Sequence, residues 1–519
     1  MKMKRIYIIS ILIGLLYGLS SCSDFLFEDP QTSMSTAQIF ADIDNIQPYL
    51  NGIYFKYRDT RVNRKGFFLL LGTDEVQQGE YQVRTEAQQS GLDKYDGFYF
   101  PENNSIAQLW NVRWPVVTLS TMALSYLNDM EKSASEIDLP SIKSYIGQAS
   151  FYRACALFEL VQYWGELPIP ELQGEKVTLS GRKPLQTVYE MIESDFNKAA
   201  EYLSGSTSSD VRIPRTWAAK AMLAKMYMSA LPESGFRDMG KAKVLLNNII
   251  TEGGFRLVNQ YADLWDGTKD PSSEIIYAFY FNNVWPDTNE LQWYAGSRAV
   301  SGDPNCYMGG YDLGLPTKYC YEITSNGGIW ETGDLRKDES IRYNFFYNGK
   351  APASVAGFGE DQTLPHIKKY EDKRIDGEKS FYNSGKNVYL VRYADVLLLY
   401  AECLNEENNT AEAVNLINNT IRSRAWGGNL PEELKWNTAM SQDEFRSKIM
   451  DERMRELCFE GWRRMDLIRT GNFVEKIKTH NRWAKESGTI QQFHERFPIP
   501  HVEIKQNTNL SENDQNPGY

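Results

Sequence analysis

Residues 142–170 read IKSYIGQASFYRACALFELVQYWGELPIP, and this stretch decides the fold class. Apolar and aromatic residues recur along it at steps of three and four, which is the spacing of one face of an α-helix. The pattern stops at Gly165, and Pro168 and Pro170 follow, which is typical of a helix end. The stretch therefore predicts a long helix that ends at Trp164.

The same periodicity recurs along the chain and predicts a mainly helical protein. One apolar stripe runs over residues 390–404, an Asn-rich turn at Asn408 interrupts it, and a second stripe covers residues 411–421. Ser441 and Glu444 have the spacing of a capping box and open another helix. Further helices are predicted at residues 39–57, 106–130, 185–203, 217–229 and 239–250. Stacked helical hairpins are the favoured architecture, although no 34-residue repeat is visible.

Residues 279–347 interrupt this helical pattern. Fifteen of these 69 residues are aromatic, about 22% against 13% for the whole chain, and glycines lie among them. We expect loops and short strands that display aromatic rings, and residues 72–104 have a similar composition. A ring beside Asn, Asp or Arg suits a sugar, because its C–H face stacks on the ring while its hydroxyls bond the polar groups. For every single ring, packing inside the protein is the alternative.

The first 22 residues have the organisation of an export signal. Three basic residues precede an apolar run of 14 residues, and Cys22 follows Leu-Ser-Ser. The run is shorter than the roughly 20 residues that a membrane-spanning helix needs. This arrangement resembles the lipobox of bacterial lipoproteins, so we expect residues 1–21 to be cleaved and Cys22 to carry the lipid anchor. An ordinary signal peptide with a cysteine nearby is the alternative.

Charge argues against nucleic acid as a ligand. The formal net charge is −12, and cleavage before Cys22 removes three basic residues and no acidic one, which takes the net charge to −15. Nucleic-acid binding needs a clustered basic surface, which an acidic chain does not favour.

Cysteines and histidines predict neither a disulfide framework nor a metal site. Five cysteines remain besides Cys22, an odd number without a Cys-x-x-Cys pair. Three of them lie in apolar helical patterns and are expected to be buried, whereas Cys306 and Cys320 could pair. The chain has only four histidines and no His-Glu-x-x-His motif, so we expect no zinc and no other cofactor.

Several segments resemble the SusD/RagB family of surface lipoproteins, and the resemblance extends over nearly all of the mature chain. Five blocks carry it: IGQASFYRA at 146–154 with YWGELP at 163–168, AAKAMLA at 218–224, VRYADVLLLYAE at 391–402, RELCFEGWR at 455–463 with DLIR at 466–469, and FPIP at 497–500 with QNPGY at 515–519. The resemblance implies a single α-rich domain at 22–519 on four tetratricopeptide-like helix pairs. Its N-terminal half would cover about 23–230, and its C-terminal half about 270–519.

The resemblance also implies a function. Family members are non-catalytic lipoproteins on the outer face of the outer membrane, which capture oligosaccharides and deliver them to a SusC-like TonB-dependent transporter. Their ligand face is made of loops, which here correspond to residues 81–104 and 285–330. Composition and position within these loops single out six candidate glycan contacts: Trp285, Trp293, Tyr294, Tyr307, Tyr81 and Tyr95.

Charged residues in the C-terminal blocks predict structure rather than catalysis. They lie on otherwise apolar helices, where burial requires pairing, so an internal ion network is expected from Arg392, Asp395, Arg455, Glu456, Glu460, Arg463 and Asp466.

Two other functions stay open at this point. Some relatives serve peptide importers, so a peptide could replace the sugar as the ligand. A glycoside hydrolase would need two carboxylates across a sugar-sized cleft. Asp74 and Glu75 are adjacent in a predicted loop, but nothing in the sequence places a second acid opposite them.

Overall fold

The computed structural model describes residues 34–519, except 174–175, 206–209, 270, 304 and 375–382. Residues from Leu50 to Tyr519 form one compact unit, and the described residues up to Tyr49 belong to a separate one. The predicted signal peptide and the predicted lipidation site, Cys22, lie outside the described residues. Within the part of the chain that is described, no helix has the length and apolar character needed to cross a membrane.

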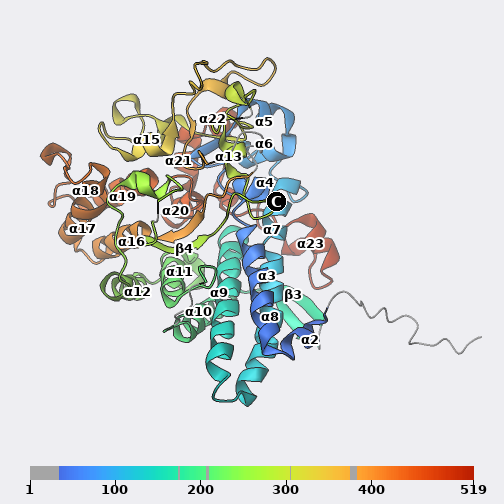
Figure 1. Ribbon diagram of the computed structural model, residues 1–519. Coiled ribbons are helices and arrows are strands. Elements are labelled where there is room, and N and C mark those ends of the chain that lie inside the picture. Colours follow the sequence, from blue (N-terminus) through green and yellow to red (C-terminus); the bar gives the residue numbers. More distant parts are fainter. Residues whose placement is uncertain (1–33, 174–175, 206–209, 270, 304, 375–382) are drawn as a thin grey trace, which may run out of the picture. The chain divides into compact units, whose positions relative to one another are not determined.

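The protein is mainly helical, as predicted, and eight of its described helices pack in four successive pairs (Figure 1). Each helix contacts the next one along the stack. The pairs are α8 (Trp114–Ser133) with α9 (Leu139–Trp164), α10 (Leu185–Tyr202) with α11 (Thr216–Ser229), α12 (Met239–Glu252) with α16 (Tyr393–Glu406), and α17 (Thr410–Ile417) with α19 (Gln442–Leu457).

Local chemistry places the helix ends where the sequence predicts them. Helix α9 ends at Gly165, whose φ of 77° is a conformation that glycine adopts without strain. Asn408 has a positive φ of 64° in the turn between α16 and α17. At the start of α19 the Ser441 hydroxyl accepts a hydrogen bond from the Glu444 amide at 3.1 Å.

Two predicted helices are each divided in the structure. Residues 106–130 fall into α7 (Asn104–Asn111) and α8, because Pro115 stands in the first turn of α8, where a missing N–H is tolerated. Residues 39–57 fall into α2 (Thr36–Phe40), a short turn at Ile43–Asn45 and α3 (Ile46–Arg58). The Asp42 side chain caps that turn by accepting from the Asp44 amide.

The strands form four two-stranded antiparallel sheets among the described residues. They are β1 (Val76–Gln78) with β5 (Gly314–Pro316), β2 (Leu167–Gln173) with β3 (Lys176–Lys183), β4 (Ile275–Phe279) with β8 (Val388–Arg392), and β6 (Ile341–Arg342) with β7 (His366–Ile367). Because β4 pairs with β8, residues 280–387 leave and rejoin the helical stack at one place. This insertion, called the loop region below, separates the two helices of the third pair.

Shorter helices belong to the loop region or flank the stack. Those before the stack are α4 (Asn63–Phe67), α5 (Glu80–Thr85) and α6 (Ala87–Lys94). The loop region holds α13 (Leu291–Ala295), α14 (Lys318–Tyr321) and α15 (Arg336–Ser340), and the C-terminal part holds α18 (Ser423–Ala425), α20 (Arg463–Arg469), α21 (Phe473–His480), α22 (Arg482–Ser487) and α23 (His501–Gln506). In Figure 1, α5, α6 and α13 lie near one another, at the end away from the tips of α8 and α9.

The predicted internal pairing of charges is confirmed and is more extensive than predicted, although Arg463 pairs with Asp74 outside the two networks described next. Six cations and six anions are joined in one buried, charge-balanced network: Arg336, Lys369, Arg392, Arg422, Arg424 and Arg455 with Glu274, Glu331, Asp334, Glu452, Glu456 and Glu460. A second balanced network joins Lys225, Arg453 and Arg469 with Asp395, Glu402 and Asp466. The first network holds the third and fourth helix pairs to the loop region, and the second joins α11, α16, α19 and α20.

The five described cysteines are buried free thiols. Cys306 belongs to a small apolar cluster with Met308 and Phe345. The possible Cys306–Cys320 pair is therefore not formed.

Candidate functional site

Four aromatic rings gather where α5 meets the loop region. The ring centroids of Tyr81 and Phe358 are 4.5 Å apart, and Trp293 stacks on Tyr311 at 5.9 Å. The guanidinium carbon of Arg298 lies 5.1 Å from the Tyr81 centroid, 4.2 Å from Tyr311 and 4.4 Å from Phe358. These four rings, partly exposed and joined by one cation, are called the ring cluster below.

Backbone contacts fix the ring cluster from two sides. The Glu80 amide at the start of α5 donates to Asp361 Oδ2 at 2.6 Å. Two residues on, Gln82 Nε2 donates to the Tyr311 carbonyl at 3.1 Å, and the Tyr311 amide donates to the Trp293 carbonyl at 2.8 Å. Helix α5 is therefore held to both loops that carry the other rings.

A buried carboxylate holds Arg298 beneath the rings. Asp312 Oδ1 accepts from the Arg298 amide at 3.0 Å, and Asp312 Oδ2 lies 3.4 Å from Arg298 Nε. The same Oδ1 lies 3.0 Å from Nε2 of the buried His366. The ring cluster thus rests on a charged layer that side chains of the loop region supply.

A pocket of about 390 Å³ adjoins the ring cluster along the chain. It is lined by Ala299, Val300, Gly302, Asp303, Cys306, Tyr347, Lys350 and Ala351. The Ala353 amide donates to the Ala299 carbonyl at 3.1 Å, so one segment borders both the pocket and Phe358. The pocket is within the size range of small-ligand sites and offers one ring, one acid and one amine.

Tyr307 and Tyr347 shape the rim of this pocket. Their rings meet edge to face with centroids 5.9 Å apart, and the Tyr347 hydroxyl donates to the Asn305 carbonyl at 2.7 Å. Burial raises the pKa of Tyr307, so its phenol stays protonated and can donate a hydrogen bond at neutral pH.

The structure places the six predicted contacts in different surroundings. Tyr81 and Trp293 are in the ring cluster, and Tyr307 is beside the pocket. Tyr294 packs against Phe67 at 6.0 Å, and its hydroxyl donates to Glu290 Oε2 at 2.6 Å. These four stay candidates by position.

Trp285 and Tyr95 lie apart from the ring cluster. Trp285 is 77% exposed on a turn that Asn282 and Asp287 close with a backbone hydrogen bond of 2.8 Å. Tyr95 is only 1% exposed, because its ring stacks on Tyr99 at 5.1 Å and its hydroxyl bonds the Gly72 carbonyl and Arg464. Burial in this core contact removes Tyr95 from the candidates.

Sequence reasoning missed two rings of the ring cluster and the arginine that joins its rings. Arg298 and Tyr311 lie inside the stretch that was predicted to bear the ligand, but no pattern distinguishes them there. Phe358 lies beyond that stretch. A signal for it exists, since Gly357 and Gly359 flank the ring and both have φ near 90°, which is typical of a loop that presents one side chain.

The acidic pair Asp74 and Glu75 is structural. Asp74 is buried and makes two hydrogen bonds with Arg463, at 2.8 and 2.5 Å. Glu75 is buried and accepts from the Phe459 amide at 2.8 Å. Neither carboxylate faces a sugar-sized cleft. In the described ranges, no group of three or more His, Cys, Asp or Glu is placed to hold a metal ion.

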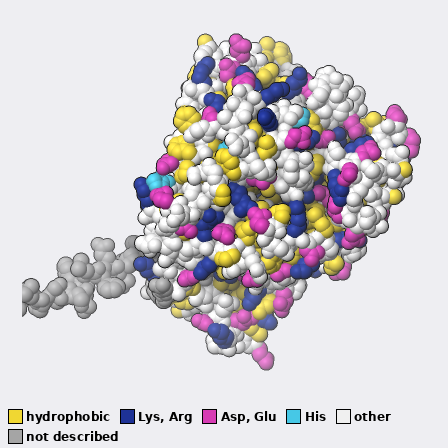
Figure 2. All heavy atoms as spheres, turned by 180° about the vertical axis from the view of Figure 1, so that it is seen from behind, with side chains coloured by type: hydrophobic (Ala, Val, Ile, Leu, Met, Phe, Trp, Pro, Cys, Tyr) yellow, Lys and Arg dark blue, Asp and Glu magenta, His cyan; other side chains and the backbone are white. Residues whose placement is uncertain are grey.

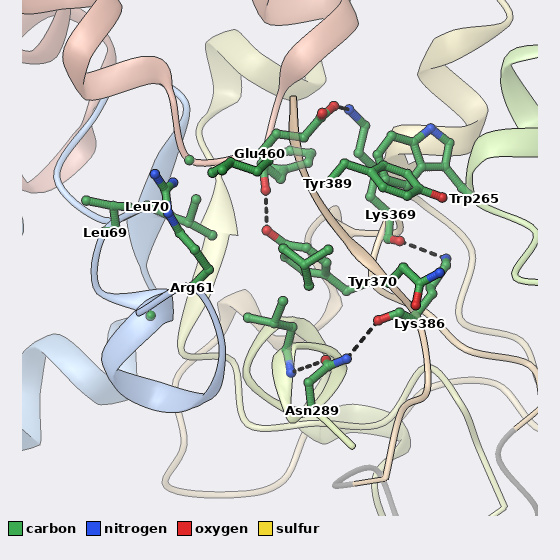
Figure 3. A pocket seen from close by; sticks show the side chains of 17 residues that line it. Arg61, Leu69, Leu70, Trp265, Asn289, Lys369, Tyr370, Lys386, Tyr389 and Glu460 are labelled. Atoms are coloured by element: carbon green, nitrogen blue, oxygen red, sulfur yellow. Dashed lines mark hydrogen bonds and ion pairs between the residues drawn. The ribbon is translucent and has the colours of Figure 1, made fainter. Parts of the chain in front are cut away.

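A second cavity lies inside the protein and is small. It encloses about 40 Å³, which is room for a few water molecules and not for a sugar (Figure 3). Lys386 Nζ donates to the carbonyls of Lys369 and Glu371 at 2.7 and 2.8 Å, and burial lowers the pKa of Lys386 to about 8. Its polar groups bond one another, so we assign this cavity to the scaffold.

The face of the molecule shown in Figure 2 has basic and acidic side chains interspersed, without a large basic patch.

Comparisons with known proteins match almost the entire chain. A family model described as "SusD family" matches residues 313–519, and one described as "Starch-binding associating with outer membrane" matches residues 24–228. The SusD-like protein P25 of Formosa agariphila is 24% identical over 99% of this chain and 100% of its own.

Solved structures show the same fold. A SusD homolog from Bacteroides thetaiotaomicron superposes with a TM-score of 0.75 at 20% identity, over 93% of this chain and 98% of its own. A laminarin-binding SusD-like protein superposes with a TM-score of 0.73 at 22% identity, over 92% of this chain and 99% of its own.

Proposed function

The chain belongs to the SusD/RagB family, and we propose that it captures oligosaccharides at the cell surface and delivers them to a SusC-like TonB-dependent transporter. The coarse assignment is carbohydrate binding without catalysis, in association with the outer membrane. The parts that we propose are capture, delivery to a transporter, the lipid anchor at Cys22 and surface exposure.

The ring cluster beside the pocket is the observation that carries this proposal. Tyr81, Trp293, Tyr311 and Phe358 present apolar faces, while Asp303 and Lys350 offer hydrogen bonds a short way along the same surface. A sugar needs this combination, because its ring has an apolar face and a polar rim. An extended oligosaccharide could then place one residue on the rings and the next in the pocket.

The same geometry predicts weak binding by the isolated protein. Stacking contributes roughly 0.5 to 1.5 kcal/mol per ring, so three of the four rings stacking on a ligand would give about 1.5 to 4.5 kcal/mol. A millimolar complex needs about 4 kcal/mol, and ordering a flexible ligand consumes part of the gain. We therefore expect dissociation constants from micromolar to millimolar, with tighter retention once the transporter encloses the sugar from the other side.

Binding is tested with a glycan array, followed by calorimetry on the oligosaccharide that binds. Replacing Tyr81 or Trp293 by Ala should weaken binding at least several-fold, since each change removes a ring from the cluster. Trp217→Ala is the matched control, because this half-buried tryptophan lies on α11 in the helical stack. Melting temperatures of all variants show that the fold persists.

Trp285→Ala decides whether the exposed turn also belongs to the site. A loss of affinity would extend the site to this turn, and unchanged affinity would confine it to the ring cluster and the pocket. If neither Tyr81→Ala nor Trp293→Ala changes affinity, the rings are packing elements and the site lies elsewhere.

Delivery to a transporter is tested separately. The full-length lipoprotein, extracted from native outer membranes in mild detergent, should copurify with a TonB-dependent barrel. Recovery of the lipoprotein alone under conditions that preserve other outer-membrane complexes would argue against delivery.

A further inference from the structure

His366 is a buried histidine at the centre of the charged layer below the ring cluster. It is 1% exposed and lies in β7, which pairs with β6. Nδ1 lies 2.7 Å from the Leu364 carbonyl oxygen, and Nε2 lies 3.0 Å from Asp312 Oδ1. Both ring nitrogens therefore face oxygen atoms.

The donors and acceptors among these groups require a hydrogen on each ring nitrogen of His366. A carbonyl oxygen can only accept, so Nδ1 must carry a hydrogen. Asp312 Oδ1 already accepts from the Arg298 amide, and the Arg298 guanidinium 3.4 Å from Oδ2 favours the ionised carboxylate. An ionised carboxylate accepts as well, so Nε2 must also carry a hydrogen. A neutral imidazole has only one N–H, and an imidazolium has two.

We propose that His366 is held as an imidazolium and is the positioning residue of the carbohydrate site. It anchors Asp312, Asp312 anchors Arg298, and Arg298 holds Tyr81, Tyr311 and Phe358 in one cluster. None of these links requires His366 to touch the ligand. The expected effect on affinity rests on the proposed function. The protonation state of His366 rests on geometry alone.

The other half of the site rests on the same histidine. The Phe345 ring meets the His366 ring edge to face, with centroids 5.1 Å apart. Phe345 packs with Cys306 and Met308, and Tyr307 and Tyr347 cover this cluster at the pocket. A shift of His366 would therefore reach both the ring cluster and the pocket.

The charges around His366 come from several elements. Asp312 precedes β5, Arg298 lies on the turn after α13, Asp361 lies on the turn before β7, and Glu80 begins α5. Asp361 is near enough to be influenced by His366, Asp312 and Glu80. Arg342 on β6 is the cross-strand partner of His366, but it forms its own ion pair with Glu371 at 2.5 Å. Arg298 and a charged His366 therefore offset the carboxylates of Asp312, Asp361 and Glu80, and with His366 neutral only Arg298 would offset them. Loss of the His366 proton should therefore loosen the contact between α5 and the loops.

The protonation state is measured by NMR on protein with ¹⁵N-labelled histidine. We expect both ring nitrogens of His366 to be protonated at about pH 7, and a single deprotonated nitrogen there would overturn the proposal. The signal is assigned by its absence in His366→Gln. If that variant does not fold, the signal is assigned by elimination through Gln variants of the other three histidines.

The positioning role is measured as the pH profile of affinity for the array-selected oligosaccharide, from about pH 6 to about pH 9. We expect the wild type to lose affinity several-fold over the range where NMR shows His366 losing its proton. His366→Gln keeps one donor for Asp312 but cannot titrate, so its affinity should be several-fold weaker and independent of pH.

His501→Gln is the matched control. Nδ1 of His501 lies 2.9 Å from Glu102 and Nε2 lies 3.2 Å from Glu512, but this histidine is near the C-terminus and outside the site. It should retain the wild-type affinity and pH profile. A wild-type pH profile in His366→Gln would refute the positioning role.

Failure of the proposed function is distinguishable from failure of this inference. If no oligosaccharide binds at any pH, near-UV circular dichroism reports the packing of the aromatic side chains instead. The wild-type spectrum should then change over the range where His366 titrates, and the His366→Gln spectrum should not. A wild-type spectrum that stays constant through that range would overturn the positioning role without any ligand.

Discussion

Glu456→Gln is the sharpest test of the buried ion network. Glu456 is fully buried and contacts three arginines, with Arg336 Nη1 at 3.1 Å, Arg392 Nη1 at 3.0 Å and Arg424 closer still. Burial alone would raise the pKa of Glu456, but the three arginines outweigh it and hold that pKa well below its usual range. Glutamine keeps the shape and removes the charge.

The expected cost follows from the charge balance of the network. The wild-type network has six cations and six anions, so the variant leaves one positive charge uncompensated inside the protein. Removing one partner of a buried ion pair costs about 3 to 5 kcal/mol. Proteins are stable by about 5 to 15 kcal/mol, so this single amide should remove a large share of the free energy of unfolding.

Urea unfolding followed by circular dichroism measures the effect. Glu444→Gln is the control, because Glu444 lies on the same helix, half exposed, at 3.3 Å from Lys448, and should cost less than about 0.5 kcal/mol. Adding Arg424→Gln to Glu456→Gln restores the balance of charge, so the double variant should lose less than the sum of the two single losses. The reasoning is refuted if Glu456→Gln unfolds within about 1 kcal/mol of the wild type.

Three other outcomes are expected. Burial would raise the pKa of Glu452, but Arg336, Arg455 and Arg422 lower that pKa from 4.5 to about 2. The ionised Glu452 therefore contributes its full stabilisation above pH 4.5, and this stabilisation is lost as the pH falls toward about 2. Urea midpoints should fall across this pH window, and midpoints that stay constant would contradict the pairing. Cys22→Ala should move the protein from membrane to soluble fractions and abolish labelling by radioactive palmitate, whereas membrane retention at wild-type levels would exclude the lipid anchor. The purified protein should release no shorter products from the bound glycan over a long incubation, and products that disappear when an acidic residue is replaced would establish a hydrolase.

Much of the fold follows from local patterns in the sequence. The end of α9 is predicted by Gly165 and the prolines after it, and the start of α19 by Ser441, because caps and periodicity act within a few residues. The division between α7 and α8 had a signal as well, in Pro115, but an uninterrupted apolar pattern concealed it. The buried ion network could be predicted because charges on apolar helices need partners, although their pairing could not.

The candidate site could be predicted only as a region. The aromatic composition of residues 279–347 selected Trp293 and Tyr307, which lie at the candidate site, and it also selected Trp285, which stands apart on its own turn. The residues that flank Tyr95 in the sequence are typical of an exposed loop, yet contacts with Tyr99 and Arg464 bury Tyr95. Burial depends on partners that are distant in sequence, so composition could not separate these cases.

The sequence by itself determined the helical stack and the resemblance to the SusD/RagB family, and it predicts an export signal before Cys22. The tertiary structure alone decided which rings meet. Glu80 and Asp361 are 281 residues apart in the sequence, yet their hydrogen bond ties α5 to the segment that carries Phe358, whose ring meets Tyr81. Helices form from interactions between neighbours along the chain, whereas a binding surface forms where distant loops converge, and their convergence is fixed by the packing of the whole unit.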